Sequence, residues 1–149
     1  MTYILDSNIL LLLVRENVFI QNEVQKRQIF SPQNQVNISI VTTGELYSLA
    51  MQNNWGQNKY LKLDNLILRL RPLPIDSQDL VDAYAEIDTY SKSKHPTLKL
   101  PVGQTAVKMG KNDLWIAALT HILDATLLTT DADFDHLDDI FFKVERIIL

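Results

Sequence analysis

The residues of this chain best suited to chemistry are carboxylates at the boundaries of short apolar segments. Asp6 ends the run Tyr3-Ile4-Leu5, and another acid follows the run Leu127-Leu128-Thr129. Two more acids stand at or near the starts of segments with helical spacing. The ligand cleft of a parallel sheet lies beyond the carboxyl ends of its strands, so a sheet that aligned these ends would collect all of them. The candidate catalytic and metal-binding acids are Asp6, Glu45, Asp113 and Asp131.

Such a cluster of acids has an electrostatic cost that indicates its chemistry. Two like charges about 4 Å apart repel by roughly 4 kcal/mol at an effective dielectric near 20, so protons or a hard cation must offset them. An all-oxygen site suits Mg²⁺ or Mn²⁺. On a phosphodiester, such a cation polarises the phosphoryl oxygens, activates a bound water and stabilises the leaving oxygen.

Each acid also has an ordinary interpretation when taken alone. An Asp at a helix start is first a cap, worth about 1 kcal/mol, which applies to Asp6 and Asp113. Glu45 alone is typical of a solvated helix surface. Only the joint pattern favours a functional site.

The elements that must position these acids alternate between strands and helices. We expect strands at residues 3–5, 36–40, 126–129 and 141–148, and helices after Asp6, over 18–30, after a cap at Thr42 or Thr43, up to Pro72, after Asp76 or Ser77, and from Asn112-Asp113. Residues 92–111 are expected to form a long loop, which in compact domains is commonly functional or mobile. This alternation predicts an α/β three-layer sandwich around a mainly parallel sheet.

Composition places few limits on this interpretation. The 149 residues, 46% of them hydrophobic, fit one soluble domain over 1–149. The absence of cysteine excludes disulfides, thiolate metal sites and a cysteine nucleophile. The apolar run Ile9 to Val14 is too short to span a bilayer and no targeting peptide is evident, so we expect a cytoplasmic protein without a membrane partner.

The formal charge of −4 hides an uneven distribution. Residues 89–112 contain five lysines and no acid, whereas residues 113–142 contain seven aspartates and no lysine or arginine. The simple interpretation is a solvated loop followed by an acidic surface. The alternative is a phosphate-attracting flap beside a cation-filled cleft. Its lysines are Lys92, Lys94, Lys99, Lys108 and Lys111.

Four segments of the chain together resemble a known family. They are Leu5-Asp6-Ser7-Asn8, Thr42-Thr43-Gly44-Glu45-Leu46, the segment from Lys111 to Ala118, and Leu128-Thr129-Thr130-Asp131-Ala132-Asp133-Phe134. Their order and spacing resemble PIN domains, and in particular the VapC-like toxin ribonucleases of type II toxin–antitoxin systems. Each motif is weak alone, but four in register cover nearly the whole chain.

The resemblance implies a Mg²⁺- or Mn²⁺-dependent endoribonuclease that forms a homodimer and is inhibited by a small antitoxin. Asp6, Glu45, Asp113 and Asp131 match the acidic quartet of the family, and Asp133 is an alternative or additional ligand. Asn8 and Thr130 match polar positions that support the site through hydrogen bonds. The lysine flap would then hold RNA phosphates.

Two other functions fit parts of the pattern. A haloacid-dehalogenase-like phosphatase also places an Asp after its first strand, but its second Asp would fall where Asn8 stands. A PIN-type interaction module without catalysis is the other alternative, although the complete quartet argues against it. The segment between the helix after Asp76 and Asp113 is long for a minimal toxin, which affects substrate choice rather than chemistry.

Overall fold

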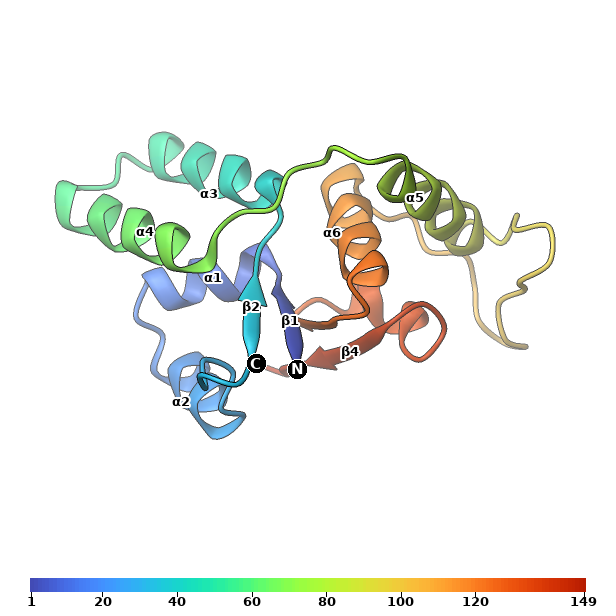
Figure 1. Cartoon of the computed structure of the whole chain (residues 1–149), viewed down its shortest axis with the longest axis horizontal. Coiled ribbons are helices and arrows are strands. Elements are labelled where there is room, and N and C mark those ends of the chain that lie inside the picture. Colours follow the sequence, from blue (N-terminus) through green and yellow to red (C-terminus); the bar gives the residue numbers. More distant parts are fainter.

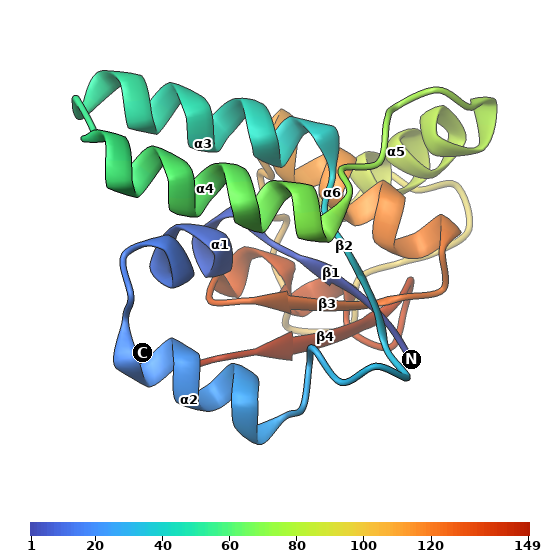
Figure 2. The same cartoon turned by 60° about the vertical axis from the view of Figure 1, so that its left-hand side comes forward.

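A four-stranded, all-parallel sheet forms the centre of the molecule. The computed structural model describes all 149 residues. The strands are β1 (Thr2–Leu5), β2 (Gln35–Asn37), β3 (Thr126–Thr129) and β4 (Lys143–Arg146), in the order β2-β1-β3-β4. Figure 2 shows them side by side in the middle of the molecule, with helices on either side. Because every strand runs the same way, all four carboxyl ends lie at one edge.

Helices cover both faces of this sheet (Figure 1). One layer contains α1 (Ser7–Val14), α2 (Val18–Lys26), α3 (Ile40–Gln52) and α4 (Gln57–Leu70); the other contains α5 (Gln78–Ser91) and α6 (Lys111–Ile122). A 3₁₀ helix, η1 (Ala132–Leu137), follows β3. The expected three-layer sandwich is therefore confirmed. No helix is long and apolar enough to cross a bilayer.

Alternation of side chains along the strands separates two hydrophobic cores. Ile4 and Leu127 point into the core under α5 and α6, whereas Leu5 and Leu128 point into the core under α1 to α4. All four side chains are fully buried, and burying each stabilises the fold by about 1.5–3 kcal/mol. Strands buried on both faces explain why these segments read as continuous apolar runs.

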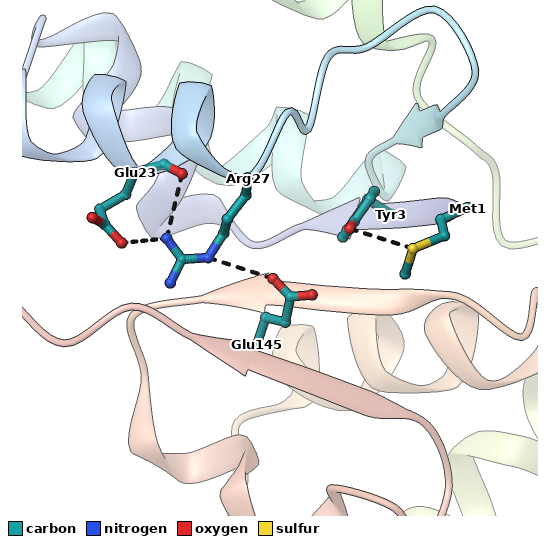
Figure 3. A network of polar contacts seen from close by, with 5 residues as sticks. All are labelled: Met1, Tyr3, Glu23, Arg27 and Glu145. Atoms are coloured by element: carbon teal, nitrogen blue, oxygen red, sulfur yellow. Dashed lines mark hydrogen bonds and ion pairs between the residues drawn. The ribbon is translucent and has the colours of Figure 1, made fainter.

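A polar network fastens α2 to the outer strand of the sheet (Figure 3). Arg27, the residue after α2, forms ion pairs with Glu23 of the same helix and, at 3.5 Å, with Glu145 of β4. Nearby, the Tyr3 hydroxyl donates to the Met1 sulfur at 3.7 Å. These ion pairs are partly exposed, so each contributes at most about 1 kcal/mol.

Several element boundaries differ from the prediction. The second strand ends at Asn37 rather than at residue 40, and α3 begins at Ile40. Its cap is Ser39, whose hydroxyl accepts from the Val41 amide at 3.2 Å, so the predicted caps at Thr42 and Thr43 are wrong. Likewise, α2 ends at Lys26 because Gln28 takes a left-handed φ of 52°, and the last strand is only Lys143–Arg146.

Other boundaries are as expected. Helix α4 ends at Leu70, where Arg71 has a left-handed φ of 49° just before Pro72. The hydroxyl of Ser77 caps α5 by accepting from the Leu80 amide at 3.3 Å. Residues 92–110 contain no helix or strand, which confirms the long loop between α5 and α6.

Candidate active site

Asp6 lies at the centre of the sheet edge, directly after β1. Its Oδ1 accepts from the Ser7 amide at 2.7 Å and so caps α1, while its Oδ2 accepts from the Thr129 hydroxyl at 2.7 Å. Only 3% of the residue is exposed. The sequence allowed Asp6 to be either a helix cap or a site residue. Its carboxylate can be both, because its two oxygens face different partners.

Burial dominates the ionisation of Asp6. It raises the pKa of this carboxyl to about 6, against the hydrogen bonds from Thr129 and Ser7, which lower it. The charges of Asp131 and Glu45 raise the pKa further. A carboxylate buried among other acids is the situation that a cation relieves.

Thr129 connects Asp6 with the acid that follows β3. Its hydroxyl oxygen accepts a hydrogen bond from the Asp131 amide at 2.9 Å, and the same hydroxyl donates a hydrogen bond to Asp6. The Asp131 carboxylate in turn caps η1 by accepting from the Asp133 amide at 2.9 Å. Thr129 is fully buried and was missed from the sequence; its position as the last residue of an apolar strand before an acid was the available signal.

Glu45 enters the site from α3. It is half-buried, and its Oε1 accepts from the Ser7 hydroxyl at 2.9 Å. Ser7 therefore donates hydrogen bonds to two acids: its amide to Asp6 and its hydroxyl to Glu45. Ser7 is the second supporting residue that the sequence did not reveal.

Asp113 is the third residue of α6 rather than its cap. The cap position is Gly110, without a side-chain hydrogen bond, so the capping interpretation of Asp113 is wrong. Burial raises the pKa of Asp113 to about 7, and the charges of Asp6, Asp131, Glu45 and Asp133 raise it in that order. The four predicted acids and Asp133 are therefore coupled electrostatically through Asp113.

The other predicted residues lie outside this hydrogen-bonded group. Asn8 is exposed and Thr130 is half-buried, and neither side chain makes a hydrogen bond within the chain. Their predicted contacts to carboxylates are absent, and a role toward the waters of a metal stays a prediction. The five lysines are exposed, and of them only Lys92 has an ion-pair partner, Asp88 at 3.0 Å.

The donor set at this edge fits a hard divalent cation. It consists of carboxylate and hydroxyl oxygens without sulfur or imidazole, and two of its acids have raised pKa values because their charged forms are disfavoured. As the side chains stand, no three His, Cys, Asp or Glu residues lie close enough together to hold an ion. A cation would thus be held by acids that turn toward a common centre, with Asp6 fixed by its two hydrogen bonds.

Comparison with known proteins assigns this architecture to a family. The family model of the PIN domain matches residues 3–140, so the chain belongs to the PIN domain family. This match confirms the resemblance found in the four sequence motifs and excludes the haloacid-dehalogenase-like phosphatase considered from the sequence. Proteins of this family are in general nucleases that use divalent metal ions.

Solved structures with the same fold include a member of a toxin–antitoxin family. A chain of VapBC2 from Rickettsia felis, bound to a DNA fragment from its promoter, superimposes with a TM-score of 0.77 at 22% identity, covering 98% of both chains. VapBC-5 from Mycobacterium tuberculosis, a member of the VapBC family of toxin–antitoxin systems, gives 0.63 at 20% identity and 98% of both chains. FitAcB from Neisseria gonorrhoeae gives 0.70 at 23% identity and 95% of both chains. No curated protein matches the chain.

Proposed function

We propose that this protein is a Mg²⁺- or Mn²⁺-dependent endoribonuclease that cleaves RNA phosphodiester bonds. The observation that carries the proposal is Asp6, a carboxylate 3% exposed that is held by two hydrogen bonds and surrounded by further acids. A buried, oriented acid in such surroundings costs stability, as buried charges do, and a bound cation offsets that cost. Membership of the PIN family supports the same chemistry.

The site residues then have separate tasks. Asp6, Glu45, Asp113 and Asp131 would hold the metal, with Asp133 as an additional ligand. The bound cation would supply a water of lowered pKa and charge stabilisation at the phosphoryl oxygens. Thr129 and Ser7 keep the carboxylates of Asp6 and Glu45 in place by donating hydrogen bonds. One of these acids would also orient the attacking water and accept its proton.

The lysines of residues 92–111 would attract the substrate. Phosphate neutralisation by Lys and Arg supplies most of the sequence-independent affinity for nucleic acids. Lys92, Lys94, Lys99, Lys108 and Lys111 are all exposed, on the segment that leads into α6 and therefore to Asp113. The net charge of −4 is no objection, because a bound cation offsets the site acids.

A biological role follows from the fold neighbours. We propose that the protein is the toxin of a type II toxin–antitoxin pair, acting in the cytoplasm as a homodimer and inhibited by a small antitoxin protein. The support is the shared fold with chains of VapBC and FitAB complexes. Expression should arrest growth, and the product of an adjacent small open reading frame should relieve the arrest. Growth that continues normally under full expression would contradict the toxin role.

The nuclease activity is tested with purified protein and a labelled RNA. Mg²⁺ or Mn²⁺ should permit cleavage and EDTA should stop it, and Asp6→Asn should lower the rate at least 100-fold because the buried metal ligand loses its charge. Asp124→Asn is the matched control: it makes the same change at an exposed acid beyond the opposite end of α6. Equal rates in the two variants would refute the assigned site.

The inactive interaction module is distinguished by metal binding. A site that retains its function gains stability from Mn²⁺ through mass action. A melting temperature that does not change in millimolar Mn²⁺, together with absent cleavage, would favour the module without catalysis.

A further inference from the structure

The long loop between α5 and α6 is fastened where its two arms meet. The Val107 amide donates to the Ser91 carbonyl at 2.8 Å, which joins the last residue of α5 to the returning arm of the loop. The Ser91 hydroxyl is 2.7 Å from Nε2 of His136 in η1 and 3.5 Å from the Met109 sulfur. Ser91 is fully buried and Met109 is 7% exposed, so this junction is part of the packed molecule.

This junction brings together lysines that are far apart in sequence. Lys92 and Lys94 leave the end of α5, and Lys108 lies on the returning arm beside Val107. With Ala106 and Val107 they line a cavity of about 300 Å³. No acid lines it, and Lys94 and Lys108 form no ion pair, whereas Lys92 is paired with Asp88. The cavity therefore carries two uncompensated positive charges on a fixed backbone.

The five lysines are consequently not equivalent. Lys99 lies near the middle of the same loop in sequence and does not line the cavity, although it is also exposed and unpaired. Lys111 is the first residue of α6, two residues before Asp113. Lys94 and Lys108 alone combine a place in the lining of the cavity, a fixed backbone and a charge without an ion-pair partner.

We infer that the cavity formed by Lys92, Lys94 and Lys108 binds a backbone phosphate of the RNA, at a position outside the bond that is cut. The inference rests on the proposed ribonuclease function and adds a substrate-anchoring site to it. Lys108 is five residues before Asp113, and a chain of that length spans at most about 18 Å. An RNA strand held in the cavity would thus reach the acidic edge within a few nucleotides.

Apolar lining supports a strand of nucleic acid rather than a free ion. Ala106 and Val107 line the cavity together with the lysines, and such a surface accepts the sugar that accompanies each phosphate. Lysine ammonium groups provide point charges without reading a base. The site would therefore fix the position of the strand and leave sequence choice to other contacts.

The test compares two variants in the uncleaving Asp6→Asn background, with a fluorescein-labelled single-stranded RNA and anisotropy as the readout. Lys94→Gln with Lys108→Gln removes two phosphate contacts, so the slope of log K against log salt should become less steep by about 1.4. The affinity ratio between parent and variant should then shrink about sevenfold from 50 to 200 mM salt. Lys26→Gln combined with Lys62→Gln matches the charge change at exposed lysines of α2 and α4, and it should leave the slope unchanged.

The outcomes separate this site from the proposed activity. Equal slopes for the cavity variant and the charge-matched control, or no measurable RNA binding by the parent, would overturn the inference even if the wild-type protein cleaves RNA. A selective loss of slope in the cavity variant supports it even if cleavage is never observed, in which case the nuclease proposal fails alone. In an active protein, the cavity variant should raise KM several-fold with kcat unchanged, whereas an equal loss of kcat would also overturn it.

Discussion

Replacing Asp6 with Asn should make the metal-free protein more stable at neutral pH while removing its activity. The geometry permits the exchange. In the variant, the amide oxygen of the new Asn side chain would accept from the Ser7 amide. Its NH₂ group would donate to the Thr129 hydroxyl oxygen, reversing the hydrogen bond that this hydroxyl donates to Asp6 in the wild type. The substitution removes a buried charge without changing the shape of the side chain. The cost of that charge can be obtained from its pKa.

The usual pKa of 3.8 is raised to about 6 in the folded chain. The folded state thus holds a proton that the unfolded state releases, so stability falls as pH rises from about 4 and the loss is complete above about 7. At about 1.4 kcal/mol per pKa unit, the loss is about 3 kcal/mol. Only 3% of Asp6 is exposed, so solvent screens little of it. Removing this charge also relieves Asp113, whose pKa it raises.

Urea unfolding in EDTA, followed by circular dichroism at pH 4 and pH 7.5, measures this effect. The stability of Asp6→Asn relative to wild type should increase by about 2.4 kcal/mol between the two pH values, because only wild type loses that contribution and unfolded Asp6 is already partly ionised at pH 4. Asp124→Asn provides the control for an exposed acid. A difference that is the same at both pH values would refute the argument that Asp6 is a destabilising buried charge.

Three other measurements examine the same site. Thr129→Val should lower the unfolding free energy by about 1.5–3 kcal/mol at pH 7.5, since a hydrogen bond to a charged group is lost, while Thr129→Ser should retain most of it in urea titrations. Mn²⁺ at about 100 times its Kd should stabilise wild type by about 2.7 kcal/mol, or about 5–11 °C in melting temperature, and Asp6→Asn much less; equal shifts would exclude Asp6 as a ligand. The Mn²⁺ affinity measured by calorimetry should fall about twentyfold from pH 8 to pH 6, because the carboxylates must release protons before they bind the ion. About tenfold of this fall comes from Asp113 and about twofold from Asp6. An affinity that does not change with pH would contradict the raised pKa values.

The sequence predicted the layers and the acids because both depend on local patterns. Apolar runs ending in Asp6 and Asp131 mark strands and their carboxyl ends. Once the strands are parallel, those ends necessarily share an edge. Helical spacing likewise predicted where Glu45 and Asp113 enter.

Which neighbour supports each acid could not be predicted, because it depends on register. Thr129 and Thr130 are adjacent, and a shift of one residue along a strand reverses the face of the sheet that a side chain occupies. Thr129 faces Asp6 because β3 pairs with β1 in the register Leu5 to Leu128. In the same way Ser7, rather than Asn8, is directed at Glu45 by the first turn of α1.

The misplaced start of α3 has a tertiary cause. Residues 38–43 are rich in β-branched side chains, which favour a strand. The chain turns helical at Ile40 because Ser39 forms a single bridge with Leu73, a residue more than 30 positions later. Leu73 accepts from the Ile40 amide and donates to the Ile38 carbonyl, each at 2.9 Å, and no local pattern contains that contact.

The hydrogen bond between Thr129 and Asp6 has a consequence for how the protein is made. Its partners are 123 positions apart, and the central strands β1 and β3 come from the two ends of the chain. A ribosome must therefore synthesise the chain at least as far as Thr129 before the acidic edge can assemble. No product that ends before Thr129 carries the site, and whatever chemistry it performs begins only when the newly made chain can close its sheet.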